Sequence, residues 1–128
     1  MKPIVHARID ARELGGEPED YLAIHEFMDS SKSVFADNRH RALTHNAWFI
    51  GHVIPKVFGE TFTRVSDGKV MSSRDIAERH TLQDFKGFIP TAQDYLQEME
   101  YTPWMNNGNG KRPKSCQSTP KTRDNILD

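Results

Sequence analysis

The stretch Gly15-Gly16-Glu17-Pro18-Glu19-Asp20 separates two helical segments and therefore decides how the chain begins to fold. Two consecutive glycines are typical of a helix end, because glycine adopts positive φ angles without strain. A proline among acidic residues is typical of a helix start, where the positive end of the helix dipole lies. We therefore predict one helix over residues 3–14 and a second from Glu17 to about Met28.

The segment that follows predicts the longest helix of the chain. Asp29-Ser30-Ser31 provides residues that favour the N-cap position, with Asp29 available as the cap. The pattern then predicts a single helix over residues 31–58, bent near Gly51 or Pro55 because both residues weaken a helix interior.

Later signals predict a hairpin and two more helices. Ser66-Asp67-Gly68 lies between two β-prone runs, and an Asp-Gly pair in this setting favours a tight hairpin turn. Helices are predicted over residues 74–85 and 92–100, with Thr91 as the N-cap of the second. The expected fold class is therefore mainly α, a compact helical bundle of about five helices with one short β-hairpin.

Composition restricts the classes of protein to consider. The chain has 128 residues, of which 36% are hydrophobic and 27% charged, so one globular domain is expected. No apolar run is long enough for a membrane span, and residues 1–8 lack the apolar region of a secretory signal. The single cysteine, Cys116, excludes a disulfide framework and a multi-cysteine zinc site. We expect a cytoplasmic protein.

The last part of the chain differs from the rest. Residues 106–128 contain five basic and two acidic residues, several glycines and prolines, and few apolar side chains. Such a segment buries too little surface to offset its ordering entropy, so we predict a domain over residues 1–105 and a disordered basic tail over 106–128. Nucleic acid is expected to bind weakly at most, through this tail.

The histidines provide the chemistry, and two of them are paired with aspartates at helical spacing. His25 and Asp29 are four residues apart, as are His80 and Asp84, so each pair points into one space. Three helices that converge in a bundle would bring these pairs together with another histidine. The candidate ligands for a divalent transition metal (Zn, Mn, Fe or Ni) are His25, Asp29, His45, His80 and Asp84. The alternative is a set of hydrogen-bonded braces without a metal.

A second set of polar residues follows the predicted long helix. Asp37, Arg41, His45 and His52 share one edge of that helix, beside its apolar stripe. The candidate ligand-binding residues are Asp37, Arg39, His40, Arg41 and His52. His6 is expected to lie on the surface or to pack within the first helix.

Several motifs together resemble a known family. The residues are Gly15-Gly16-x-Pro18-Glu19-Asp20-Tyr21-Leu22-x-Ile24-His25, Arg39-His40-Arg41-Ala42-x-x-His45, His80-x-x-x-Asp84, Ile89-Pro90-Thr91 and Pro103-Trp104-Met105. This pattern resembles a domain-of-unknown-function family of small bacterial and phage proteins. The resemblance implies a compact, mainly helical domain of bacterial or phage origin, and no assigned activity comes with it.

Two functions from different classes remain open. The first is a non-enzymatic binding module for a host protein or a small nucleotide ligand, which could also form an oligomer. The second is a metal-dependent hydrolase that acts on a phosphoester, with the His/Asp set as its metal site. No glycine-rich phosphate loop and no G-x-S-x-G motif is present, which favours the first. The two functions are distinguished by whether the His25/Asp29 and His80/Asp84 pairs face each other.

Overall fold

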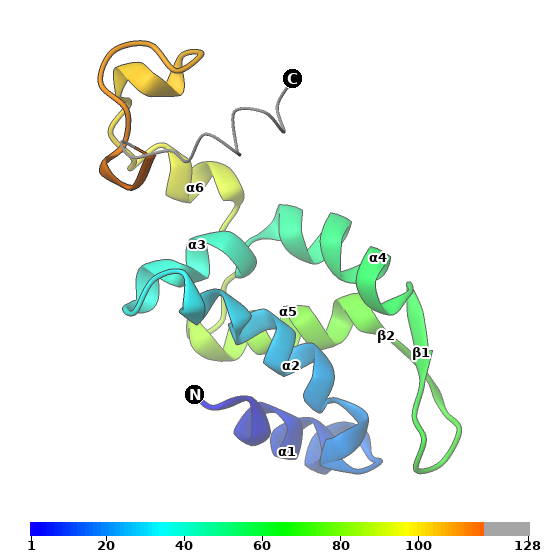
Figure 1. Ribbon diagram of the computed structural model, residues 1–128. Coiled ribbons are helices and arrows are strands. Elements are labelled where there is room, and N and C mark those ends of the chain that lie inside the picture. The colour runs from blue at the N-terminus through cyan, green and yellow to red at the C-terminus, as the bar shows by residue number, and fades with distance from the viewer. Residues whose placement is uncertain (117–128) are drawn as a thin grey trace. The chain divides into compact units, whose positions relative to one another are not determined.

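The computed structural model describes residues 1–116, which form six α-helices and one two-stranded antiparallel hairpin (Figure 1). This confirms the predicted mainly α-helical fold. Residues 1–96 make up one compact unit, and the described residues from Gln97 onward belong to a second. The second unit contains two short 3-10 turns, Pro103–Met105 and Lys114–Cys116. Part of the predicted basic tail, residues 117–128, lies outside the described residues, so its disorder stays a prediction.

The first two helices form as their flanking residues predict. Helix α1 spans Pro3–Leu14 and ends at Gly15, whose φ of 93° favours glycine. A 3-10 turn, η1 (Pro18–Asp20), then precedes helix α2 (Leu22–Asp29). The Asp20 carboxylate accepts a hydrogen bond of 2.7 Å from the backbone N–H of Glu17, which fixes the start of this turn.

The hairpin and the helix after it also confirm their predictions. Strand β1 (Thr61–Thr63) pairs with β2 (Val70–Ser72), with Phe62 opposite Met71. Helix α5 spans Ser73–Asp84, and the Ser72 hydroxyl accepts a hydrogen bond from the backbone N–H of Asp75 as its N-cap. In the described part of the chain, no helix has both the length and the apolar character that crossing a bilayer requires.

The predicted single helix over residues 31–58 is wrong, because the segment is broken into five short elements. These are η2 (Ser30–Ser33), η3 (Asn38–His40), α3 (Arg41–Thr44), the π-helix η4 (Phe49–Val53) and α4 (Ile54–Phe58).

Two local causes explain breaks in this segment. After α3, the Asn46 amide donates to the Ala42 carbonyl and accepts from the Phe49 N–H, replacing bonds that a continuous helix would make within the backbone. The wide π turn ends at Val53, two residues before Pro55, whose ring would clash with the preceding turn of a regular α-helix. Asp37 caps η3 instead of continuing a helix.

The last helix of the first unit is shorter than predicted. Helix α6 covers Ala92–Leu96 instead of residues 92–100. Its start agrees with the sequence, because Thr91 and Asp94 exchange hydrogen bonds of 2.8 and 3.1 Å between side chain and backbone.

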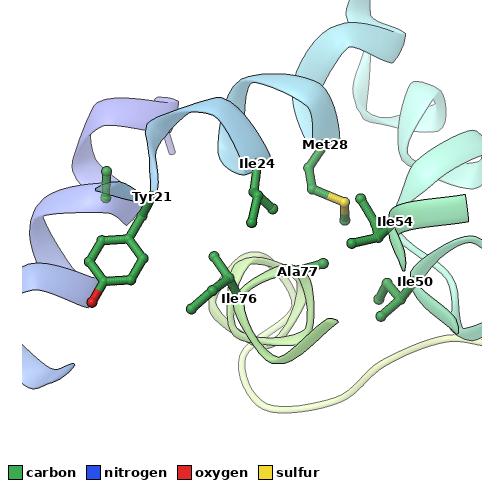
Figure 2. Packing of buried hydrophobic residues seen from close by; sticks show 8 residues of the cluster. Tyr21, Ile24, Met28, Ile50, Ile54, Ile76 and Ala77 are labelled. Carbon is green, nitrogen blue, oxygen red and sulfur yellow. The ribbon is translucent and has the colours of Figure 1, made fainter. Parts of the chain in front are cut away.

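The hydrophobic core is small and lies between α2, α5 and the η4–α4 segment. Figure 2 shows Ile76 and Ala77 of α5 facing Ile24 and Met28 of α2, with Ile54 beside them. Among the described residues, eight hydrophobic side chains are buried, against thirteen buried polar or charged ones. Buried polar groups carry a desolvation cost, which the packing of so few apolar side chains does not offset.

The hairpin is attached to the helices by a buried arginine. Arg64 donates to the Leu14 carbonyl and to the Tyr21 hydroxyl at 2.8 and 2.9 Å, and it pairs with Asp67. We expect Arg64→Met to lower the free energy of unfolding by about 2–3 kcal/mol, and Tyr21→Phe by about 1 kcal/mol. Urea unfolding followed by circular dichroism checks both values. Unchanged midpoints would show that this network does not stabilise the fold.

Candidate metal centre

Three helices carry the same pair, a histidine followed four residues later by an aspartate. The pairs are His6 and Asp10 on α1, His25 and Asp29 on α2, and His80 and Asp84 on α5. Residues at this spacing share one helix face. Because α1, α2 and α5 pack against one another (Figure 1), all six side chains enter the same interior, where none is more than 7% exposed.

The hydrogen bonds in this interior run between helices. His25 Nε2 bonds to Asp10 on α1, and His80 Nε2 lies 3.1 Å from Asp29 Oδ1 on α2. The His25/Asp29 and His80/Asp84 pairs therefore face the same space, which favours a metal site. The prediction that Asp29 caps a third helix is wrong, because its side chain makes no cap bond and points to His80.

Four donor groups converge on one point: Asp29, His45, His80 and Asp84 each offer an atom within 4.8 Å of the others. His80 Nε2 lies 3.1 Å from Asp29 Oδ1 and 3.2 Å from Asp84 Oδ2, and His45 Nε2 lies 2.9 Å from Asp84 Oδ2. Ligands about 2.1 Å from a tetrahedral zinc ion are separated by about 3.4 Å. The observed separations are therefore close to those of a metal ligand set.

The orientation of His45 is set by its neighbour Thr44. The Thr44 hydroxyl donates its single proton to the Met28 carbonyl at 2.7 Å, so it accepts from His45 Nδ1, also at 2.7 Å. His45 therefore carries its proton on Nδ1. Its Nε2 lone pair points at the carboxylates of Asp84 and Asp29, and only a proton or a cation between them makes that contact favourable.

Burial and the neighbouring charges shift the pKa values of this cluster in opposite directions. Burial lowers the pKa of His45, and the Asp84 carboxylate only partly offsets it. Burial also disfavours the charged form of His80, but hydrogen bonds to Asp29 and Asp84 outweigh it and raise the pKa of His80. Burial would raise the pKa of Asp84, but the nearby imidazoles of His45, His6 and His80 outweigh it and hold that pKa well below the usual range.

A second group, His6, His25 and His80, also places three ligand atoms within 4.8 Å of one another. However, the rings of His6 and His80 stack with centroids 3.8 Å apart and an interplanar angle of 26°. An imidazole nitrogen binds a metal in the plane of its ring, and two stacked rings cannot both meet that condition at one ion. The group with Asp29 and Asp84 is therefore the better candidate.

The predicted polar strip of Asp37, Arg41, His45 and His52 does not form, because the long helix that would align these residues is broken. Asp37 and Arg39 pair with each other on the surface at 2.8 Å. His52 is exposed and lies beside Trp48, with ring centroids 6.0 Å apart.

The two remaining residues of that set lie close to the metal candidates. His40 is buried, and its Nδ1 bonds to the Ser31 hydroxyl at 2.8 Å. Arg41 borders the cluster, with one terminal nitrogen 3.8 Å from Asp84 Oδ1, and its guanidinium lies over the Phe85 ring. Lys32 provides a second cation at the edge, 3.7 Å from Asp29 Oδ2.

Residues 1–105 match the family described as a domain of unknown function, DUF6915. The chain belongs to this family. The matched residues include every helix that contributes to the buried cluster, so the cluster is a feature of the DUF6915 domain in this chain. No curated protein and no solved structure matches the chain.

Sequence reasoning missed two residues of the DUF6915 cluster, His6 and Asp10. His6 is fully buried, in contrast to the expected position on the surface or within its own helix, and its Nδ1 bonds to Gln83 at 2.6 Å. Asp10 is also fully buried and accepts from Arg79 at 2.7 Å. The signal was present, because His6 and Asp10 have the same four-residue spacing as the two pairs that were recognised.

Proposed function

We propose that the DUF6915 domain of this chain is a metal-binding module that holds one divalent transition metal ion through Asp29, His45, His80 and Asp84. The carrying observation is the orientation of His45, whose Nδ1 is committed to Thr44 while its Nε2 faces the two carboxylates. The two carboxylates balance the charge of a divalent cation, and the two imidazoles bind it as neutral ligands. The bound cation therefore removes the cost of burying two carboxylates side by side.

The donor set restricts the choice of metal. Imidazole nitrogen and carboxylate oxygen suit Zn²⁺, Mn²⁺, Fe²⁺ and Ni²⁺, whereas a site without thiolate is poorly suited to Cu⁺. Zn²⁺ is the appropriate first probe, since it accepts four ligands in a tetrahedral arrangement.

Burial of the ligands supports a non-enzymatic role. The four ligand side chains are 0–7% exposed. Structural metal sites are closed by four protein ligands, whereas catalytic sites keep one position open to water or substrate. As a binding module of bacterial or phage origin in the cytoplasm, the domain would present a host protein or a small nucleotide with a surface that the metal holds in shape.

One observation favours the alternative of a metal-dependent phosphoester hydrolase. Arg41 and Lys32 place two cations at the edge of the cluster, beside Asp84 and Asp29. Arginine binds phosphate oxygens through its planar guanidinium, so these residues could hold an anionic substrate next to the metal.

Metal titration tests the proposal. The full chain, purified without chelator or histidine tag, is expected to contain about one equivalent of metal by elemental analysis or to take up one equivalent of Zn²⁺ by calorimetry. Asp29→Asn is expected to weaken binding at least about 100-fold, since outer-shell changes alone cost about 10–100-fold. Asp37→Asn is the matched control, because Asp37 is a half-exposed surface aspartate paired with Arg39.

The outcomes separate the two functions. Wild-type protein that takes up no Zn²⁺, Mn²⁺, Fe²⁺ or Ni²⁺ would overturn the metal site. Metal-loaded protein that hydrolyses bis(p-nitrophenyl) phosphate, with the activity lost in Arg41→Ala, would replace the binding module by the hydrolase.

A further inference from the structure

His80 is contacted through both nitrogens of its ring, and the second contact is not part of the four-residue site. Its Nε2 faces Asp29 and Asp84, while its Nδ1 lies 2.9 Å from Nδ1 of His25. The ring centroids of His25 and His80 are 5.1 Å apart, with an interplanar angle of 24°. With the nitrogens 2.9 Å apart and the centroids 5.1 Å apart, the two rings meet head to head, as in an N–H···N hydrogen bond.

The other nitrogen of His25 begins a series of hydrogen bonds that leads to the surface. His25 Nε2 bonds to Oδ2 of Asp10. The second oxygen of Asp10 accepts from Arg79 Nε at 2.7 Å, and Arg79 also bonds to Glu13 at 3.1 Å. Asp10 is therefore held as a carboxylate in a fixed orientation.

This chain of contacts decides which nitrogen of each ring carries the proton. A carboxylate accepts, so His25 carries its proton on Nε2 and presents a lone pair at Nδ1. That lone pair accepts from Nδ1–H of His80. A neutral His80 with its proton on Nδ1 then has its lone pair on Nε2, directed toward the carboxylates of Asp29 and Asp84.

We infer that His25 and Asp10 are positioning residues for the metal ligand His80: His25 accepts the Nδ1 proton of His80, and Asp10 holds His25 in the tautomer that can do so. The inference rests on the proposed metal site and deepens it. Metal-binding histidines usually donate their second N–H to a carboxylate or carbonyl. Here an imidazole stands between the ligand and the carboxylate.

This assignment differs from the sequence prediction that His25 is a ligand. A metal on the line between two rings that meet head to head would lie about 2.0–2.1 Å from each nitrogen, which requires nitrogens about 4 Å apart, whereas these are 2.9 Å apart. The fully buried His6 stacks on the face of His80 and provides no acceptor in line with its Nδ1.

Zinc affinity of paired variants tests the inference. His25→Leu is expected to weaken Zn²⁺ binding about 10–100-fold while one equivalent still binds. His25→Gln is expected to restore most of the affinity, because its carbonyl accepts from His80 and its amide donates to Asp10. Asp10→Asn is expected to give an intermediate loss. Tyr21→Phe is the control for lost stability, since Tyr21 is fully buried and its hydroxyl bonds to Gly15 and Arg64, outside the cluster.

A spectroscopic readout separates positioning from general destabilisation. In zinc-loaded, ¹⁵N-labelled protein, His80 is expected to show a slowly exchanging Nδ1–H and a metal-shifted Nε2. The Nδ1–H signal should be lost in His25→Leu and retained in Tyr21→Phe.

Distinct results would overturn the inference or the proposed function. Equal zinc affinity and an unchanged His80 spectrum in His25→Leu would remove the positioning role but leave the metal site. Two equivalents in wild type, reduced to one in His25→Leu, would make His25 a ligand of a second ion. Absence of zinc uptake by the wild type would overturn the metal site itself, and the positioning role with it. If His25→Leu does not fold, Asp10→Asn and the wild-type spectrum still decide the matter.

Discussion

Replacing His80 by alanine is expected to abolish stoichiometric metal binding and to lower the free energy of unfolding by about 3–5 kcal/mol. His80 is fully buried and bonds to Asp29 and Asp84 through Nε2 and to His25 through Nδ1. Its removal leaves two buried carboxylates without their shared partner, and the expected cost is that of uncompensated buried charge.

Calorimetric zinc titration and urea unfolding of the metal-free protein measure the two effects separately. His52→Ala is the matched control, because His52 is exposed and lies outside the cluster. We expect this variant to bind zinc as the wild type does and to change stability by less than about 0.5 kcal/mol. Normal zinc binding by His80→Ala would remove His80 from the site.

Removing the metal with a chelator is expected to lower the Tm strongly, which is the second large effect. Zinc at about 1,000 times its Kd stabilises a protein that binds only in the folded state by about 4 kcal/mol. For a domain of this size that difference corresponds to a rise in Tm of more than about 10 °C. Thermal unfolding with zinc and with a chelator measures the shift. Asp84→Asn is expected to show almost none, and an unchanged wild-type Tm would contradict the prediction.

The stabilisation by zinc is expected to decrease as the pH falls. Hydrogen bonds to Asp29 and Asp84 outweigh burial and raise the pKa of His80 above its usual value, so the metal-free protein keeps a proton there up to a higher pH than an ordinary histidine does. Zinc binding must release that proton. Affinity therefore rises with pH until His80 is neutral and falls about tenfold per pH unit below its pKa. The carboxylates resist protonation, since the pKa of Asp84 lies well below its usual range.

The elements that the sequence predicted correctly depend on residues within about four positions of one another. Gly15 ends α1, Ser72 caps α5, and the Asp67-Gly68 turn connects the two strands. Spacing and residue type also predicted four residues as candidate ligands that the structure places within 4.8 Å of one another: Asp29, His45, His80 and Asp84.

Two errors have different physical origins, one local and one tertiary. The helix predicted over residues 31–58 was inferred from its apolar stripe, but the polar side chain of Asn46 and the ring of Pro55 change the backbone path. His6 was expected on the surface or packed within the first helix, because a lone histidine does not reveal which neighbour covers it. Its burial depends on how α1 packs against α5.

The sequence by itself determined that this chain forms several helices with a hairpin, and that histidines and aspartates recur on helix faces at a spacing of four. Only the tertiary structure decided which of them meet. Helical spacing places His25 and Asp29 on one face. The packing of α1 and α5 against α2 then makes Asp10 the hydrogen-bond partner of His25 and His80 the partner of Asp29. The reason is physical: local hydrogen bonds and propensities set the direction of a side chain, whereas its partner is set by the contacts between helices distant in the sequence.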